Sequence, residues 1–241
     1  MDPDATPKQT NVDDIVRQAA DDAAETLGEG DTRLGFLKKA GLAGGAVVGS
    51  GALLGALTPA GAVAKGGKGR PPASFGKGDV GILNFALTLE YLEAAFYNEA
   101  TANQGKSKFI KDAQTRVFLK TVTVDENAHV AFLRKALGSK AIAAPKVDFG
   151  NTTSNEASFL KTAVALENTG VHAYSGQALN IASPAYIAAA LSIWSIEARH
   201  ASVAGLLLTG KPSGLTPDGP FDTPLTAAAV LKAVKKTGFI Q

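Results

Sequence analysis

The chain has 241 residues, of which 45% are hydrophobic, a length that suits one well-buried domain and a tail. It contains no cysteine, so disulfides, thiolate metal sites, iron–sulfur clusters and cysteine nucleophiles are excluded. The formal net charge is +2, and the basic residues are scattered rather than clustered among aromatic residues. This distribution of charge does not indicate nucleic-acid binding. Because the chain has no cysteine, any bound metal must use Glu, Asp and His side chains.

The first 64 residues have the composition of a leader followed by an export signal. Residues 1–31 are polar and acidic with weak periodicity, which is typical of a disordered or partly helical leader. A basic segment comes next, then an uncharged stretch at residues 40–64 that ends in Ala-Val-Ala and precedes the basic, glycine-rich KGGKGR. This succession predicts an export signal that is cleaved after Ala64.

The route of export is less clearly indicated than export itself. The segment TRLGFLK resembles the twin-arginine export motif, but Leu34 stands where that motif has its second arginine. An uncleaved membrane anchor is the alternative, because 25 uncharged residues are long enough to span a bilayer. The seven glycines of this stretch lower its hydrophobicity and favour a cleaved signal. We therefore expect a periplasmic, cell-envelope or extracellular protein.

Helical periodicity begins at residue 79, after a linker at residues 65–78, and continues almost throughout. Ser183-Pro184 predicts a helix start with a capping hydroxyl and a proline at the first helical position. The segment 138–154, rich in turn-forming residues, is long enough to return the chain along a bundle. We predict long helices over residues 79–100, 108–137, 155–181 and 184–208, and a short final helix over 225–236.

Two short connections on either side of a long one predict an all-α four-helix bundle in which the crossover joins helices two and three. The expected single domain is 79–241. A weak internal repeat aligns residues 86–97 with 163–174, and each copy is followed by a helix bearing Glu-x-x-His. The bundle should therefore contain two similar helix pairs, antiparallel within each pair, that face each other.

Two of the three histidines follow a glutamate by three residues, in Glu126-Asn-Ala-His129 and Glu197-Ala-Arg-His200. Residues at this spacing share one helix face, about 5–6 Å apart at Cβ, so each pair can offer an oxygen and a nitrogen to one ion. Glu90 and Glu167 occupy equivalent positions in the repeat. All four glutamates lie at helical spacing among apolar residues, which predicts that they face the bundle core.

Four buried carboxylates need compensation, because an unpaired buried carboxylate is costly or takes up a proton. No comparable set of core-facing Lys or Arg residues is available in the pattern. Two divalent cations would balance the four carboxylates, and two imidazoles would complete a ligand set that suits iron or manganese. We therefore predict that two Fe or Mn ions are bound by Glu90, Glu126, His129, Glu167, Glu197 and His200.

This succession of Glu, Glu-x-x-His, Glu and Glu-x-x-His resembles the ligand pattern of ferritin-like di-metal proteins. The chain is similar to the bacterial ferritin-like family that includes desiccation-related proteins, over about residues 75–240 and including the tail GPFDTPLTAAAVLKAV. The resemblance implies a ferritin-like bundle with its di-metal ligands at the six residues named above.

Some neighbouring residues have more than one interpretation. Glu93 is either a seventh ligand or a carboxylate outside the ligand set, near the ligands or in solvent, and its repeat partner Gly170 favours the second. Tyr97 and Tyr174 either assist catalysis, through hydrogen bonds to the ligands or electron transfer, or simply pack the core. Three residues are expected to stand outside the site: His172 as a structural histidine, Trp194 as a packing residue and Arg199 on the surface.

The leading function is an exported di-iron or di-manganese protein that reacts with dioxygen or peroxide, with ferroxidase, peroxidase or catalase-like chemistry in stress protection. The main alternative is a non-enzymatic desiccation or stress protein with a structural or vestigial metal site. An iron-storage cage would need subunit contacts that one sequence does not show. Expected partners are metal ions and a small oxidant, with a membrane only through an uncleaved N-terminal segment; homo-oligomerisation is left open.

Overall fold

Four long helices dominate the computed structural model, which describes residues 69–241. The export signal and its cleavage site are predicted for residues outside this range. The described part contains no strand, only an isolated antiparallel bridge between Val147 and Ile240, and none of its helices is long and apolar enough to cross a membrane. In chain order the elements are η1 (Ala73–Phe75), α4 (Gly78–Ser107), α5 (Ala113–Leu137), η2 (Gly138–Lys140), α6 (Glu156–Gln177), η3 (Ala178–Asn180), α7 (Pro184–Thr209), η4 (Pro212–Gly214) and α8 (Ala227–Thr237).

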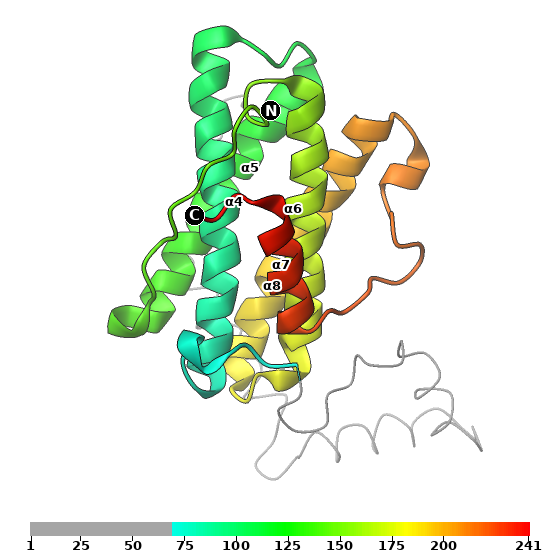
Figure 1. Ribbon diagram of the computed structural model, residues 1–241. Helices are drawn as coiled ribbons and strands as arrows, with labels where there is room; N and C mark the ends of the chain where they lie inside the picture. The colour runs from blue at the N-terminus through cyan, green and yellow to red at the C-terminus, as the bar shows by residue number, and fades with distance from the viewer. Residues whose placement is uncertain (1–68) are drawn as a thin grey trace, which may run out of the picture.

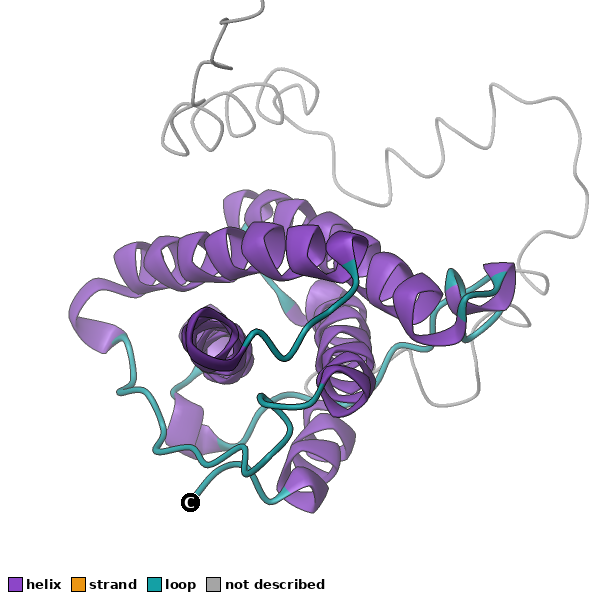
Figure 2. Cartoon of the chain, turned by 90° about the horizontal axis from the view of Figure 1, so that it is seen from above, coloured by secondary structure: helices purple, strands orange, loops and turns teal. Residues whose placement is uncertain are grey.

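The helices pack as the two pairs that the internal repeat predicts. Helix α4 packs along α5 and α6 packs along α7, and the pairs meet through contacts of α4 with α6 and of α5 with α7. The short connections within each pair make its helices antiparallel. Figure 1 shows the long connection from α5 to α6 running along the bundle, and Figure 2 shows helices and loops accounting for the whole described chain. The predicted all-α four-helix bundle with a crossover is confirmed.

The two largest differences from the predicted helix boundaries have local reasons. Helix α4 extends seven residues beyond residue 100 and ends where Lys108 adopts a left-handed conformation with φ 50°. Helix α5 starts at Ala113 rather than at Lys108. Its N-terminus is set by Asp112, whose side chain accepts a hydrogen bond of 2.6 Å from the backbone N–H of Thr115. Both features depend on backbone conformation at a few positions, which periodicity does not reveal.

The start of α7 is as predicted, but its capping group is not. Pro184 occupies the first helical turn, whereas the Ser183 side chain makes no capping hydrogen bond, so the prediction of a capping hydroxyl is wrong. The backbone N–H groups of Ala182 and Ser183 instead donate to the carboxylate of Asp79, at 2.9 and 2.8 Å. Because Asp79 lies in the first turn of α4, this contact joins the starts of two helices from different pairs.

The apolar core consists of two clusters of buried side chains. The larger cluster is rich in aromatic residues and includes Phe96, Tyr97, Phe118, Phe149 and Phe159. The smaller one includes Leu83, Leu87, Leu133, Tyr174 and Ile193. Along each of the four long helices, the predicted ligands lie between residues of one cluster and residues of the other. The acidic residues are thereby placed at mid-bundle, with apolar packing on both sides.

Candidate metal centre

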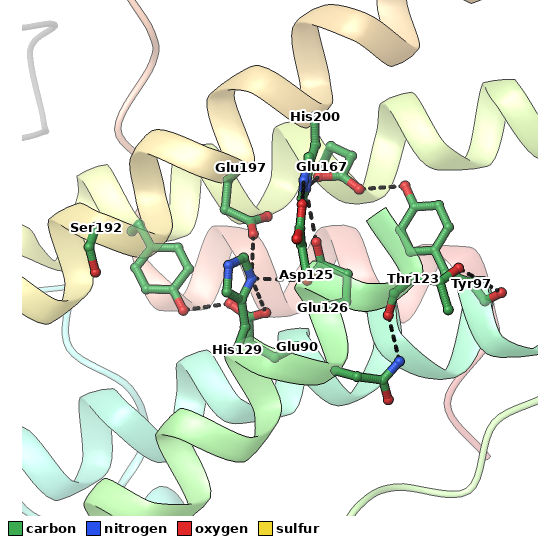
Figure 3. A network of polar contacts seen from close by, with 12 residues as sticks. Glu90, Tyr97, Thr123, Asp125, Glu126, His129, Glu167, Ser192, Glu197 and His200 are labelled. Atoms are coloured by element: carbon green, nitrogen blue, oxygen red, sulfur yellow. Dashed lines mark hydrogen bonds and ion pairs between the residues drawn. The ribbon is translucent and has the colours of Figure 1, made fainter. Parts of the chain in front are cut away.

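The structure brings the six predicted ligands together in the bundle core. The four glutamates have no exposed surface, and the two histidines are 9% and 6% exposed. Figure 3 shows these side chains pointing toward one another from different helices. Helix α4 supplies Glu90, α5 supplies Glu126 and His129, α6 supplies Glu167, and α7 supplies Glu197 and His200. None of the predicted ligand positions lies on the solvent side of its helix.

The ligand atoms fall into two overlapping groups, and within each group they lie within 4.8 Å of one another. The first group contains Glu90, Glu126, His129 and Glu197, and the second contains Glu126, Glu167, Glu197 and His200. Each group thus has its own glutamate and its own histidine. The glutamates of the two Glu-x-x-His motifs, Glu126 and Glu197, belong to both groups. A carboxylate in this position can bridge two ions.

Both imidazoles direct Nδ1 into the carboxylates. The Nδ1 atom of His129 lies 3.2 Å from one oxygen of each of three glutamates, namely Glu90, Glu126 and Glu197. The Nδ1 atom of His200 lies 2.9 Å from Glu126 Oε1 and 3.3 Å from Glu167 Oε2. Each ring nitrogen is therefore close to several carboxylate oxygens at once, as in a set of ligands around one cation.

Burial and crowding shift the pKa values of these groups in the metal-free chain. Burial raises the pKa of Glu126 to about 7, even though the close imidazoles of both histidines act in the opposite direction. Burial and the neighbouring carboxylates raise the pKa of Glu197 well above its ordinary value. Burial alone would lower the pKa of His129, but the surrounding carboxylates raise it instead. Without metal, the cluster therefore holds protons in the space between its carboxylates.

Several polar atoms of the cluster make no hydrogen bond within the described structure. They are Glu90 Oε2, Glu126 Oε1, Glu167 Oε2, both carboxylate oxygens of Glu197 and His200 Nδ1. Buried polar atoms normally have partners, and ionised carboxylates cannot donate hydrogen bonds to one another. A cation satisfies several oxygens and a nitrogen together. The atoms without a hydrogen bond and the mixed oxygen and nitrogen donors therefore fit a pair of metal ions.

The model of the ferritin-like domain family matches residues 78–210, a segment that includes all four long helices and all six predicted ligands. The chain belongs to the ferritin-like domain family. A comparison with curated proteins found no match. The family match covers ferritin-like domains in general, so membership of the desiccation-related group stays a prediction.

Two tyrosines of this ferritin-like domain are hydrogen-bonded to predicted ligands. The Tyr97 hydroxyl donates to Glu167, and the Tyr174 hydroxyl donates to Glu90 at 2.5 Å. Each tyrosine follows the glutamate of its own repeat by seven residues but reaches the glutamate of the other repeat. The two hydrogen bonds therefore link α4 to α6 on both sides of the centre. A role for these residues in electron transfer stays a prediction.

Sequence analysis missed Asp125, the residue before Glu126. Its Oδ2 atom lies 3.1 Å from Nε2 of His200, so both ring nitrogens of that histidine have carboxylate neighbours. A carboxylate at the outer nitrogen fixes the ring orientation and directs the other nitrogen to a metal. Ile196 occupies the matching position on α7 and offers no such contact to His129. The only sequence signal was an acidic residue next to a predicted ligand.

The remaining candidates occupy distinct environments. Glu93 is only 2% exposed, so the interpretation of Glu93 as a solvated carboxylate is wrong. His172 is turned away from the ligands as expected, and its Nε2 atom lies 2.8 Å from Asp218 in the loop after α7. Arg199 is exposed, and Trp194 packs beside the smaller apolar cluster, both as expected.

A groove between α5 and α7 reaches the edge of the centre. Its volume is about 560 Å³, and His200, Asp125 and Arg199 contribute to its lining. The rest of the lining is largely apolar and includes the exposed side chains of Val117 and Val203. A small molecule in this groove would contact His200, which is a predicted ligand.

Proposed function

We propose that this ferritin-like domain binds two iron or manganese ions and reacts with dioxygen or peroxide, as an exported protein in stress protection. The main evidence for this proposal is the pair of overlapping ligand groups that have Glu126 and Glu197 in common. Glu90 and His129 would complete one site, and Glu167 and His200 the other. Two adjacent redox-active ions supply the electrons needed to reduce a small oxidant.

The protein's own contribution is to orient the ligands and to exclude water. Tyr97 and Tyr174 hold one oxygen of Glu167 and of Glu90, which limits the rotation of these carboxylates. Asp125 holds the outer nitrogen of His200. The apolar clusters on both sides keep bulk water from the four fully buried glutamates, so their charges act in a medium of low polarity.

The groove between α5 and α7 is an argument for a small substrate. The groove makes His200 accessible from the surface, whereas the glutamates behind this residue have no exposed surface. A larger substrate could contact only the edge of the centre at His200, so a centre whose glutamates are fully buried suits a molecule as small as dioxygen or hydrogen peroxide. This arrangement favours reaction with a small oxidant over reaction with a polymer.

The decisive experiment adds Fe(II) or Mn(II) to the metal-free protein under anaerobic conditions, measures the bound metal, and then supplies dioxygen or peroxide. We expect two ions per chain and consumption of the oxidant. Glu167→Gln should reduce both, whereas Glu99→Gln, a matched change on α4 outside the ligand groups, should reduce neither. Binding of two ions without oxidant consumption would instead support a structural metal site. Failure to bind metal would refute the proposal.

A further inference from the structure

A fifth carboxylate lies buried beside the ligand groups without belonging to either. Glu93 follows Glu90 by three residues on α4, so both side chains project from one face of the helix. It is 2% exposed, and its Oε2 atom makes no hydrogen bond with any described residue. A buried carboxylate in this condition requires a proton or a cation nearby.

Gly170 on α6 creates the space into which Glu93 projects. It follows Glu167 by three residues and is therefore the counterpart of Glu93 in the internal repeat. A Cβ atom placed on Gly170 would lie 3.3 Å from Glu93 Oε1 and 2.6 Å from Glu197 Oε2. The second distance is too short for a real contact, so a larger residue here would displace Glu197. The absent side chain thus leaves a space at which two carboxylates meet.

Glu197 is the shared glutamate that has no hydrogen bond on either carboxylate oxygen. His129 Nδ1 lies 3.2 Å from its Oε1 atom, whereas its Oε2 atom faces Gly170. Glu93 adds a second carboxylate on the side that Gly170 leaves open, with its Oε1 atom toward the glycine. Two adjacent ionised carboxylates repel each other unless a positive charge lies between them. A metal ion bound by Glu197 would supply that charge without any further residue.

We propose that Glu93 is a seventh ligand of the di-metal centre and binds beside Glu197 over Gly170. This inference rests on the proposed di-metal function and makes the centre asymmetric, since the other repeat has no counterpart carboxylate. Five carboxylates around two divalent ions carry a net negative charge. The added carboxylate therefore favours hard cations and stabilises a more highly charged, oxidised pair of ions.

The test titrates the metal-free full-length protein with Co(II), whose visible absorption weakens as its coordination number rises. We expect wild type to bind two Co(II) ions per chain. Glu93→Gln should lower the affinity by at least about tenfold and should increase the absorption per bound ion, because one ligand is lost. Glu99→Gln is the matched control, since Glu99 lies on the same helix and accepts a hydrogen bond from Thr153 outside the centre. It should behave as wild type.

Glu93→Asp provides a second variant that keeps the charge but withdraws the carboxylate by one methylene. Because the shorter side chain would no longer reach the ion, the absorption should change in the same direction as in Glu93→Gln. This variant replaces Glu93→Gln if circular dichroism shows that Glu93→Gln does not fold. An unchanged spectrum in the folded variant tested would overturn the proposal, even with weaker binding, because Glu93 would then act only on another ligand. Failure of wild type to bind Co(II) would instead refute the di-metal function itself.

Discussion

The tyrosine hydroxyl groups show how single residues connect the two halves of the centre. Tyr97 should stabilise the fold through its buried hydrogen bond to the Glu167 carboxylate. We expect Tyr97→Phe to lower the free energy of unfolding by about 1.5–3 kcal/mol, the range for a hydrogen bond to a charged group. Tyr91→Phe is the control, because the Tyr91 hydroxyl has only a 3.4 Å contact with the backbone oxygen of Ile142. Urea denaturation that gave equal losses would contradict this role.

Asp125 distinguishes the two histidines of the centre. Its contact with Nε2 of His200 should fix that ring, whereas His129 has Ile196 at the corresponding position. We expect Asp125→Ala to weaken the binding of one ion by about 10- to 100-fold and to affect the other much less. Calorimetric titration with Mn(II) resolves the two steps, and Asp222→Ala, an exposed aspartate in the loop before α8, is the control. Equal weakening of both steps would show that Asp125 does not act through His200.

At the level of elements, the C-terminal segment is held against α6 by a close backbone approach. The backbone N–H of Leu225 donates to His172 O at 3.0 Å, and a Cβ atom on Gly176 would lie 1.8 Å from Leu225 O. We expect Gly176→Ala to destabilise the protein by about 1–3 kcal/mol, because the segment must move away. Gly105→Ala in α4 has free space around it and should be neutral or stabilising by up to about 1 kcal/mol. Thermal melts should therefore give a lower midpoint for Gly176→Ala and an unchanged or higher midpoint for Gly105→Ala.

For the whole molecule, the buried carboxylates should oppose folding in the absence of metal. The pKa of Glu126 rises from an ordinary value of 4.5 to about 7 because of burial, so the folded protein holds a proton there that the unfolded chain releases. The contribution of Glu126 to the free energy of unfolding is therefore largest below pH 4.5 and declines as the pH rises through 7. Metal-free Glu126→Gln should accordingly gain in melting temperature relative to metal-free wild type between pH 5 and pH 8.

Metal should reverse this order of stability. Excess Mn(II) at about 100 times the dissociation constant adds about 2.7 kcal/mol for each ion that binds only the folded state. We expect this rise in wild type and a much smaller one in Glu126→Gln, which lacks a shared ligand. If Mn(II) left the wild-type midpoint unchanged while Glu126→Gln destabilised the metal-free protein, these glutamates would be ordinary structural partners.

The export prediction also concerns the whole molecule. We expect the mature protein to begin at Lys65, because Ala62-Val63-Ala64 supplies small residues at the usual positions before a cleavage site. N-terminal sequencing of the protein from the producing cells tests this. A membrane-retained product that begins at Met1 would favour the uncleaved anchor.

The amino-acid sequence by itself determined the four long helices, their pairing and the six candidate ligands. These features depend on local periodicity and on spacings of three residues, which place side chains on one helix face whatever the rest of the molecule does. The repeat also indicated that Glu90 and Glu167 are equivalent. The long crossover followed from the length of one connection between helices.

Only the tertiary structure decided which side chains meet between helices. Tyr97 and Glu167 are 70 residues apart, and Asp125 and His200 are 75 apart, so no local pattern indicates either contact. The glycine at the counterpart position favours a place outside the ligand set for Glu93, yet the Glu93 carboxylate is buried and its Oε1 atom faces that glycine. The physical reason is packing: these contacts depend on how closely two helices approach, and that distance is set by side chains on both of them.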